Sequence, residues 1–405
     1  MDEKIKWVAN SMPKSEDEHL GIMDPSVIKK ARAFHASFPQ YRETPLATLN
    51  AQAAHLGLGG LYVKDESFRF GLNAFKVLGS SFAIACHIAE KTGRDVGACG
   101  YGYLTSEEFS HDFEPVTLFT ATDGNHGRGV AWAARQLGQK AVVRMPAGTT
   151  MPRLKNIQAE GAEVTIEKVG YDACVQMAAD EAAACEQGLL VQDTAWEGYE
   201  EIPSWIMQGY GTMASEVIGQ LAATGVARPT HVFVQAGVGS LAAAIAGYFA
   251  NLYPTEPPTF VVVECSEAAC HYRSALAGDG SRHSIEGKMA SIMAGLCCGT
   301  PSTVAWDILR NHADAFVSCP DWVTARGMRI LGAPEKGDPR VISGESGAVS
   351  VGLLATAMTE PEYASLRDEL GLDGSSSVLC FSTEGDTDPD RYRRIVWDGE
   401  CPSCC

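Results

Sequence analysis

The sequence predicts an α/β fold with mostly parallel sheets, and three observations support this fold class. Short runs rich in β-branched and aromatic residues recur, helical stretches follow three of them, and glycines or polar residues mark two of the junctions. The strand-like runs are residues 116–122, 140–146, 230–237 and 259–265, and the helical stretches are residues 125–138, 153–161 and 240–253. Strands that alternate with helices along a chain are typical of parallel sheets.

The position of these repeats predicts two domains. One group of strand–helix units occupies roughly residues 86–190, between the Gly-rich, acidic segment GACGYGYLTSEEFSHDFE and the segment VQDTAWEGYEEIP. We expect residues 86–190 to form a smaller α/β domain, inserted into a larger one made of residues 1–85 and 191–405. In each of the two lobes we expect a mostly parallel, twisted sheet flanked by helices.

Composition excludes several classes of function. The 405 residues include 32 Lys and Arg against 50 Asp and Glu, which gives a formal net charge of −18. This excess of negative charge repels nucleic acids and anionic membrane surfaces. The N-terminus has no secretory signal pattern, and no run reaches the roughly 18 apolar residues of a membrane-spanning helix. We therefore expect a cytoplasmic protein without nucleic-acid or membrane partners.

The 13 cysteines are scattered along a chain without a secretory signal, so we expect mostly buried, reduced thiols. Cys401, Cys404 and Cys405 end the chain but lack a second ligand pair at zinc spacing, so we predict no metal site. Cys270 and Cys298 flank one segment, and the sequence leaves open whether they form a disulfide.

Lys76 is the first candidate catalytic residue. It directly precedes an apolar-periodic helix and lies between Phe75 and Val77. A lysine shielded by apolar neighbours loses its proton more easily, as amine nucleophiles and Schiff-base lysines require. Taken alone, however, a lysine at a helix start more often extends its side chain to water.

A glycine-containing turn is the second candidate element. A buried-strand pattern runs into Gly237, Val238, Gly239 and Ser240 and then directly into a helix. Glycines let the backbone approach an anion closely, and the free N–H groups of a helix start favour a phosphate. Residue 242 is Ala, so the dinucleotide-binding pattern is absent. By itself the turn is equally consistent with a plain tight connection.

The third element, ATDGNHG at residues 121–127, again lies at a strand-to-helix junction. Polar and glycine residues at the carboxyl end of a strand mark the usual position of a binding crevice. His126 alone is more often a hydrogen-bonded structural histidine than a catalytic one.

Together these elements resemble the fold-type II pyridoxal-phosphate enzymes, the family that includes threonine dehydratase, threonine synthase and cysteine synthase. They occur in the order and spacing of that family, and the resemblance extends from Thr44-Pro45-Leu46 to about residue 390. Further matching segments are KDES at 64–67, QGYGT at 208–212, GESGA at 344–348 and Ser382-Thr383. The resemblance implies a fold-type II, two-lobed α/β enzyme with pyridoxal 5'-phosphate as its cofactor.

The resemblance assigns cofactor-binding roles by position to Lys76, Asn125, Gly237, Val238, Gly239, Ser240, Glu345, Ser382 and Thr383. Lys76 would carry the cofactor, and Asn125 would hydrogen-bond the 3′-oxygen of its ring. The glycine turn would hold the phosphate. Either Ser382 or Thr383 would meet the pyridine nitrogen, and a neutral hydroxyl there suits β-elimination.

Asp123 departs from the common family pattern, in which this position carries a small neutral residue. A carboxylate beside the cofactor could remove a proton from Cα or attract a cationic substrate group. The alternative is that Asp123 only caps the following helix, a role that Asp fills well.

Asp193 is a second unusual acid, in the segment VQDTAWEGY. With SIMAGLCCG at 291–299, ISGESGAV at 342–349 and FSTEGDTD at 381–388, it makes the chain similar to one branch of the family, the diaminopropionate ammonia-lyases. This resemblance implies a carbon–nitrogen lyase of amino-acid catabolism that converts 2,3-diaminopropionate to pyruvate and two ammonia. Acids in the pocket would suit the second, cationic amine of this substrate.

The branch also implies that both enantiomers are accepted, which requires bases on both faces of the cofactor. Lys76 would serve the L-isomer, and Asp123, assisted or positioned by Asp193, the D-isomer. The alternatives are a serine or threonine dehydratase of the same fold and a relative that has lost catalysis. By resemblance we also expect a homodimer.

Overall fold

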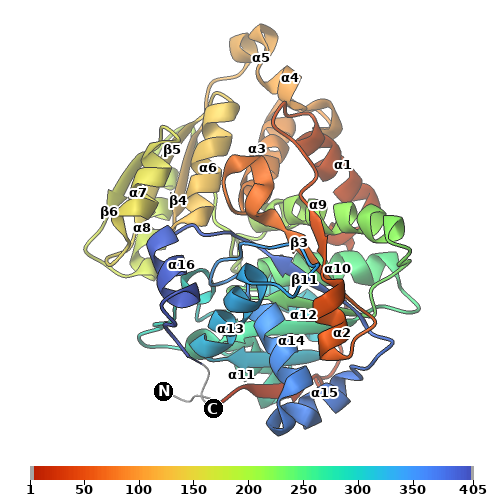
Figure 1. The fold of residues 1–405 in the computed structure, drawn as a ribbon. Coiled ribbons are helices and arrows are strands. Elements are labelled where there is room, and N and C mark those ends of the chain that lie inside the picture. The colour runs from red at the N-terminus through yellow and green to blue at the C-terminus, as the bar shows by residue number, and fades with distance from the viewer. Residues whose placement is uncertain (1–3, 403–405) are drawn as a thin grey trace.

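The computed structural model describes residues 4–402, and its strands form two separate sheets (Figure 1). The larger sheet has seven strands in the order β1-β10-β9-β8-β11-β3-β2. The smaller sheet has four strands in the order β6-β5-β4-β7. Residues 1–3 and 403–405 lie outside the described part, so the prediction made for Cys404 and Cys405 of the tail falls there too.

Most strand pairs are parallel. The five central strands of the larger sheet and all four of the smaller one pair in parallel, and only the edge strands β1 and β2 are antiparallel. In the larger sheet the strands are β1 (Lys6–Ala9), β10 (Ala315–Cys319), β9 (Thr259–Cys265), β8 (His231–Gln235), β11 (Ser377–Ser382), β3 (Gly60–Asp65) and β2 (Leu46–Thr48). In the smaller sheet they are β6 (Glu163–Ile166), β5 (Lys140–Met145), β4 (Thr117–Ala121) and β7 (Gly188–Leu190). The predicted fold class is confirmed.

Helices flank both sheets (Figure 1). The α-helices are α1 (Pro25–Ala36), α2 (Asn50–Leu56), α3 (Val77–Thr92), α4 (Tyr101–Leu104), α5 (Glu107–Asp112), α6 (Asn125–Gln136), α7 (Met151–Gln158), α8 (Tyr171–Ala184), α9 (Glu201–Ala223), α10 (Ser240–Leu252), α11 (Cys270–Ala277), α12 (Thr303–His312), α13 (Asp321–Gly332), α14 (Val349–Thr359), α15 (Ala364–Leu370) and α16 (Pro389–Val396). Short 3-10 helices are η1 (Leu20–Met23), η2 (Glu66–Gly71), η3 (Val96–Ala98), η4 (Ser266–Ala268), η5 (Ala294–Leu296) and η6 (Pro361–Tyr363).

The larger sheet is buried on both faces. In β8, Val232 and Val234 belong to one apolar cluster, which also contains side chains of α9, α10 and α12. Phe233, between them, points to the opposite face and joins a second cluster with side chains of α13 and α14. Successive strand residues face opposite sides, so a strand covered on both faces is apolar in its centre, as Val232, Phe233 and Val234 are here.

The predicted domain division has a structural counterpart in the sheets but not a sharp boundary. All four strands of the smaller sheet lie between Thr117 and Leu190. The boundary that we expect at residues 85 and 86 falls inside α3 (Val77–Thr92), which packs against both α6 and α9. The division into 1–85 plus 191–405 and 86–190 therefore stays a prediction.

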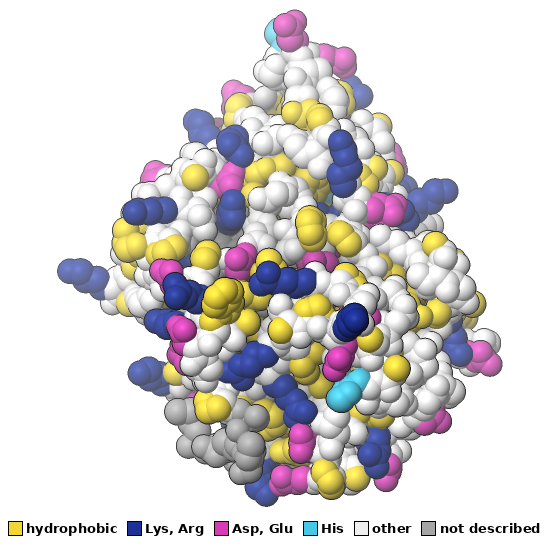
Figure 2. All heavy atoms as spheres, viewed as in Figure 1, with side chains coloured by type: hydrophobic (Ala, Val, Ile, Leu, Met, Phe, Trp, Pro, Cys, Tyr) yellow, Lys and Arg dark blue, Asp and Glu magenta, His cyan; other side chains and the backbone are white. Residues whose placement is uncertain are grey.

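The surface agrees with the charged composition. On the face shown in Figure 2, Lys and Arg side chains are interspersed with Asp and Glu side chains. Within the described residues, none of the helices combines the length and apolarity needed to cross a bilayer.

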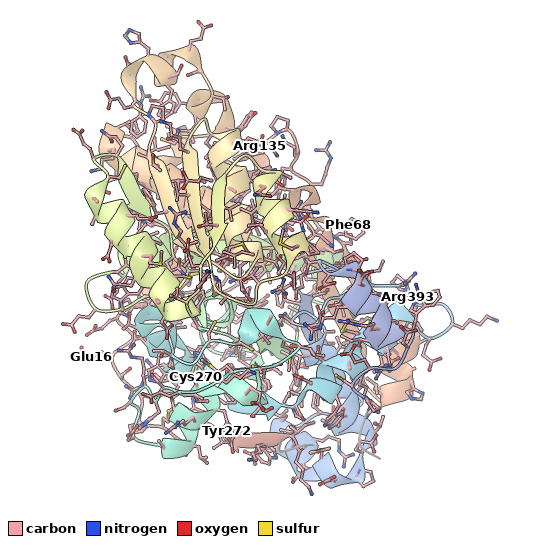
Figure 3. The ribbon with its side chains drawn as sticks, turned by 90° about the vertical axis from the view of Figure 1, so that its left-hand side faces the viewer. Glu16, Phe68, Arg135, Cys270, Tyr272 and Arg393 are labelled. Carbon is pink, nitrogen blue, oxygen red and sulfur yellow. The ribbon has the colours of Figure 1, made fainter. Side chains whose placement is uncertain are left out.

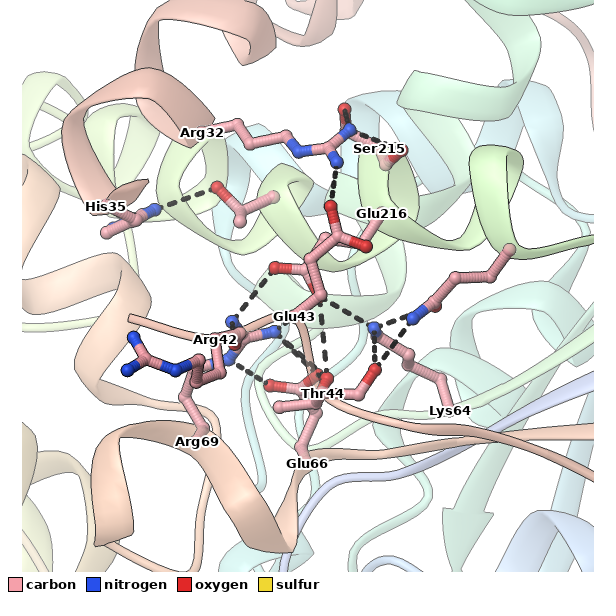
Figure 4. Close-up of polar contacts among 12 residues, drawn as sticks. Arg32, His35, Arg42, Glu43, Thr44, Lys64, Glu66, Arg69, Ser215 and Glu216 are labelled. Atoms are coloured by element: carbon pink, nitrogen blue, oxygen red, sulfur yellow. Dashed lines mark hydrogen bonds and ion pairs between the residues drawn. The ribbon is translucent and has the colours of Figure 1, made fainter. Parts of the chain in front are cut away.

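A buried network of charges supports the segment that leads to Lys76 (Figure 4). Its charged members are all at most 1% exposed, namely Lys64, Glu66, Arg69 and Glu216. Glu216 of α9 accepts from Lys64 Nζ at 2.6 Å and from Arg69 Nη2 at 2.8 Å, while Arg69 Nε donates to Glu66 at 2.8 Å. Two cations and two anions thus balance, and the network ties β3 and η2 to α9.

Replacing Glu216 by Gln should lower the free energy of unfolding by about 3–5 kcal/mol, because buried cations would lose a counter-ion. Denaturant titration measures this change. The matched control is Glu362→Gln. It breaks the ion pair between Glu362, whose side chain is 57% exposed, and Lys4. That change should cost less than about 1 kcal/mol. Similar losses in both variants would contradict a structural role for the buried network.

Candidate active site

A cavity of about 360 Å³ lies where turns from both sheets meet. Its lining includes residues that follow β4 and β7 of the smaller sheet and residues that follow β8 and β11 of the larger one. The carboxyl ends of parallel strands meet at one edge of a sheet, and α/β proteins bind ligands in the crevice there. Here the carboxyl ends of strands from both sheets border the cavity, so turns of the two sheets enclose it together.

Lys76 and Asp193 form an ion pair across this cavity. Lys76 is the N-cap residue of α3, after β3 of the larger sheet, whereas Asp193 follows β7 of the smaller one. Lys76 Nζ donates to Asp193 Oδ2, and both side chains line the cavity. The pair brings together two of the three predicted catalytic residues, which are separated by 117 positions in sequence.

The ion pair shifts the pKa of both groups. Burial lowers the pKa of Lys76, as its apolar neighbours predict, but the Asp193 carboxylate together with Tyr210 and Cys298 more than compensates, and the net effect raises the pKa. For Asp193, burial raises the pKa, yet the Lys76 ammonium together with His126 more than compensates and lowers the pKa to about 2. The local sequence indicates the apolar surroundings of Lys76 but not its counter-ion, which is distant in the chain.

Asp123 lines the cavity and does not cap a helix. The N-cap of α6 is Gly124, and no side-chain capping bond is present there. Instead, Asp123 is 40% exposed, and one of its carboxylate oxygens lies 3.6 Å from Arg153 Nη1. The capping alternative is thus excluded, and the carboxylate is available to a ligand in the cavity.

The glycine turn has the form of an anion cradle. Gly237, Val238, Gly239 and Ser240 all line the cavity, and Ser240 begins the 13-residue helix α10. Gly239 has φ +99°, and a Cβ there would lie 2.5 Å from Nε2 of the buried His271. Only glycine satisfies both conditions, and the start of a helix offers free N–H groups to which a phosphate can bind.

The two candidate hydroxyls for the ring nitrogen have different surroundings. Ser382 is fully buried, does not line the cavity and donates its hydroxyl to Ser343 Oγ at 2.8 Å. Thr383 lines the cavity, and its Oγ1 accepts from Gln235 Nε2 at 2.7 Å. Because that oxygen already acts as acceptor, its proton is free to be donated, so Thr383 is the better candidate.

Asn125 and Glu345 occupy different positions relative to the cavity. Asn125, the first residue of α6, lines it and donates through Nδ2 to Glu384. Glu345 is 5% exposed and does not line it, although its neighbour Ser346 does. Burial, followed by the charge of Glu384, raises the pKa of Glu345 to about 7. The predicted contact between Glu345 and the cofactor therefore has no support in this geometry.

Five further residues line the cavity although the sequence analysis gave them no role in the site: Arg153, Tyr171, Tyr210, Cys298 and Glu384. Tyr210, Cys298 and Glu384 lie in segments that carry the family resemblance, but only the tertiary structure shows that their side chains line the cavity. His126 also lines the cavity, and its Nε2 lies 2.8 Å from the carbonyl oxygen of Val191. Burial lowers the pKa of His126, which favours the neutral ring.

The cysteines near the cavity are free thiols. Cys270, at the start of α11 (Figure 3), donates from Sγ to the backbone oxygen of Cys298 at 3.4 Å. All cysteines of the described residues are unbridged, including this pair. The open question of a Cys270–Cys298 disulfide is answered by two free thiols here.

Comparison with known proteins agrees with this site. Residues 38–364 match the family described as pyridoxal-phosphate dependent enzyme. A diaminopropionate ammonia-lyase from Salmonella typhimurium is 47% identical over 402 residues, which cover 98% of this chain and 99% of the relative. The holo diaminopropionate ammonia lyase of Escherichia coli has a TM-score of 0.91 at 43% identity, with both chains covered completely. Its complex with D-serine has a TM-score of 0.90 at 43% identity, with 99% of each chain covered.

Fold and site together define a fold-type II, pyridoxal-phosphate dependent lyase. Within that class, the chain belongs to the diaminopropionate ammonia-lyase family. The cofactor is pyridoxal 5'-phosphate, and the cavity fits it. The glycine cradle, the cavity-facing lysine and the hydroxyl of Thr383 match its phosphate, aldehyde and ring nitrogen in chemistry.

The raised pKa of Glu345 predicts a pH dependence of stability. Its ordinary value is 4.5, and the folded value is about 7, so the folded state keeps this proton while the unfolded state loses it. Stability contributed by this group is therefore lost as pH rises from about 4.5 to about 7. Replacing Glu345 by Gln should remove that part of the loss, which denaturant titration at both ends of the window measures. Parallel stability–pH curves for both proteins would contradict this.

Proposed function

We propose that this chain converts 2,3-diaminopropionate to pyruvate and two ammonia. The observation that carries the proposal is the full-length, 47% identity to a diaminopropionate ammonia-lyase, combined with a cavity that contains Lys76 and three carboxylates. The carboxylates belong to Asp123, Asp193 and Glu384. A substrate with a second, cationic amine is attracted by such a lining more strongly than serine or threonine is.

Each residue has a distinct part in the proposed reaction. The N–H groups of residues 237–240 would hold the phosphate of pyridoxal phosphate, Thr383 would donate to its ring nitrogen and Asn125 to its ring oxygen. When bound, pyridoxal phosphate supplies an electron sink for the charge that develops at Cα. Asp193 orients Lys76, to which it is paired. Lys76 can take the Cα proton of the L-isomer only as a neutral amine, so it must first have given up its ammonium proton.

Asp123 is the proposed base for the D-isomer. It reaches the cavity from the smaller-sheet side, whereas Lys76 is carried by α3 of the larger-sheet side. The two groups are thus carried by different elements, as two opposed bases must be. Arg153 Nη1 lies 3.6 Å from Asp123 Oδ2 and is close enough to orient this carboxylate.

Further proposals concern the assembly and its setting. We propose residues 1–85 plus 191–405 and residues 86–190 as two domains, a homodimer as the assembly, and the cytoplasm as the compartment. The free thiols of the described cysteines suit a reducing compartment. Light scattering of the purified protein tests the dimer.

The proposed activity is tested by incubating the purified, cofactor-loaded protein with D- and L-2,3-diaminopropionate, serine and threonine. We expect pyruvate from both diaminopropionate isomers, with two ammonia released per pyruvate, at rates far above those of the hydroxy amino acids. Lys76→Ala serves as the control and should abolish turnover. A preference for serine or threonine would transfer the function to a dehydratase of the same fold.

Replacing Asp123 by Asn should lower turnover of the D-isomer by about 10²–10⁴-fold, the usual contribution of a general base. The L-isomer should be much less affected, because Lys76 serves it. Steady-state rates with the two separate isomers measure the ratio, and the L-isomer acts as the internal control. Equal losses for both isomers would refute this assignment of faces.

A further inference from the structure

Glu384 is a buried carboxylate of the cavity whose only part so far is its negative charge in the lining. It follows Thr383 after β11, is 7% exposed and lines the cavity. A buried carboxylate is costly unless its oxygens accept hydrogen bonds. The groups that donate hydrogen bonds to the Glu384 carboxylate therefore indicate why an acid is present at this position.

The side chain joins two segments that are distant in sequence. Oε2 of Glu384 accepts from Asn125 Nδ2 across 259 positions, and Oε1 accepts from the backbone N–H of Ser346 at 3.1 Å. Asn125 belongs to α6, beside the smaller sheet, whereas Ser346 precedes α14, beside the larger sheet. The carboxylate thus connects the two sides of the cavity.

The backbone of Glu384 also holds the segment before Lys76. Glu384 forms an isolated bridge with Ala74, and its carbonyl oxygen accepts from Gly344 N–H at 2.9 Å. Phe75 N–H donates to the preceding carbonyl, that of Thr383, at 3.1 Å. These contacts hold the backbone from which the Glu384 side chain reaches Asn125.

The hydrogen-bond partners of Glu384 distinguish it from the other two acids of the cavity. Asp193 faces Lys76 and Asp123 faces Arg153, but the two donors to the Glu384 carboxylate, the Asn125 side-chain amide and the Ser346 backbone N–H, are uncharged. An ionised carboxylate only accepts hydrogen bonds, so the amide of Asn125 must turn its NH₂ group toward Glu384. The second N–H of that group and the amide oxygen are thereby oriented as well.

We propose that Glu384 is a positioning residue that acts through Asn125. By accepting one N–H of the Asn125 amide, it selects the amide orientation that leaves the other N–H for the cofactor in the cavity, and so increases cofactor affinity. The inference rests on the proposed function, because it assigns this cavity to pyridoxal phosphate and an amino-acid substrate.

The test is a double-mutant cycle on cofactor affinity. Pyridoxal phosphate is titrated into the cofactor-free wild type, Glu384→Gln, Asn125→Ala and the double variant, and binding is followed by visible absorbance. In Glu384→Gln the new amide can donate as well as accept, so the orientation of Asn125 is no longer selected. We expect each single change to weaken binding by about tenfold or more, in line with a hydrogen bond to a charged group.

The double variant should bind pyridoxal phosphate only slightly more weakly than the single variant with the lower affinity. The reason is that the effects of two residues that act as one unit are not additive. We also expect a shifted visible spectrum of the bound cofactor in Glu384→Gln, since a ring contact changes. Additive losses in affinity would overturn the proposal, because Glu384 would then act independently of Asn125. An unchanged affinity and spectrum in Glu384→Gln would overturn it too.

Asp338→Asn provides the matched control. The Asp338 carboxylate accepts from the N–H groups of Ala51 and Gln52, both at 2.8 Å, at the start of α2, and it does not line the cavity. This change should lower the thermal midpoint without altering cofactor affinity. If Glu384→Gln behaved in the same way, its role would be structural only and the proposal would fail. Failure of the proposed function would appear in the turnover assay of the wild type with diaminopropionate. Failure of the present proposal would appear in the cofactor affinities, so the two failures are distinguishable.

Discussion

The ion pair between Lys76 and Asp193 is the interaction on which the site depends. Each group follows a strand of a different sheet, so their contact joins the two halves of the cavity. A partly buried charge without its partner is strongly unfavourable, which makes the pairing a geometric constraint on both sheets. The same pairing raises the pKa of Lys76 and lowers that of Asp193, so one contact affects both the position and the pKa of the central lysine.

Around this pair, three acids share one cavity but differ in their partners. Asp193 is balanced by a lysine, Asp123 lies near an arginine and is partly exposed, and Glu384 accepts from neutral N–H groups. Because environment sets the behaviour of a carboxylate, these surroundings separate a positioning acid, a proposed base and a proposed orienting acceptor. An elimination that removes a proton from either face of one carbon needs such a division of roles.

The rest of the fold holds the turns that carry these groups. The buried network of Lys64, Glu66, Arg69 and Glu216 anchors the chain between β3 and Lys76 to α9. His271 leaves no room for a side chain at Gly239 of the glycine turn, which lines the cavity. Rigid elements outside the cavity therefore determine where the few reactive groups inside it lie.

The sequence by itself determined the strand–helix alternation, the lysine before α3 and the glycine turn before α10. These features depend on local periodicity and on backbone requirements, which are written in neighbouring residues. Only the tertiary structure decided that Thr383 rather than Ser382 faces the cavity, that Asp123 does not cap α6 and that Glu345 points elsewhere. It also brought Glu384 to Asn125 across 259 positions. Contacts of this range arise when turns of two sheets converge, and no local pattern in the chain encodes them.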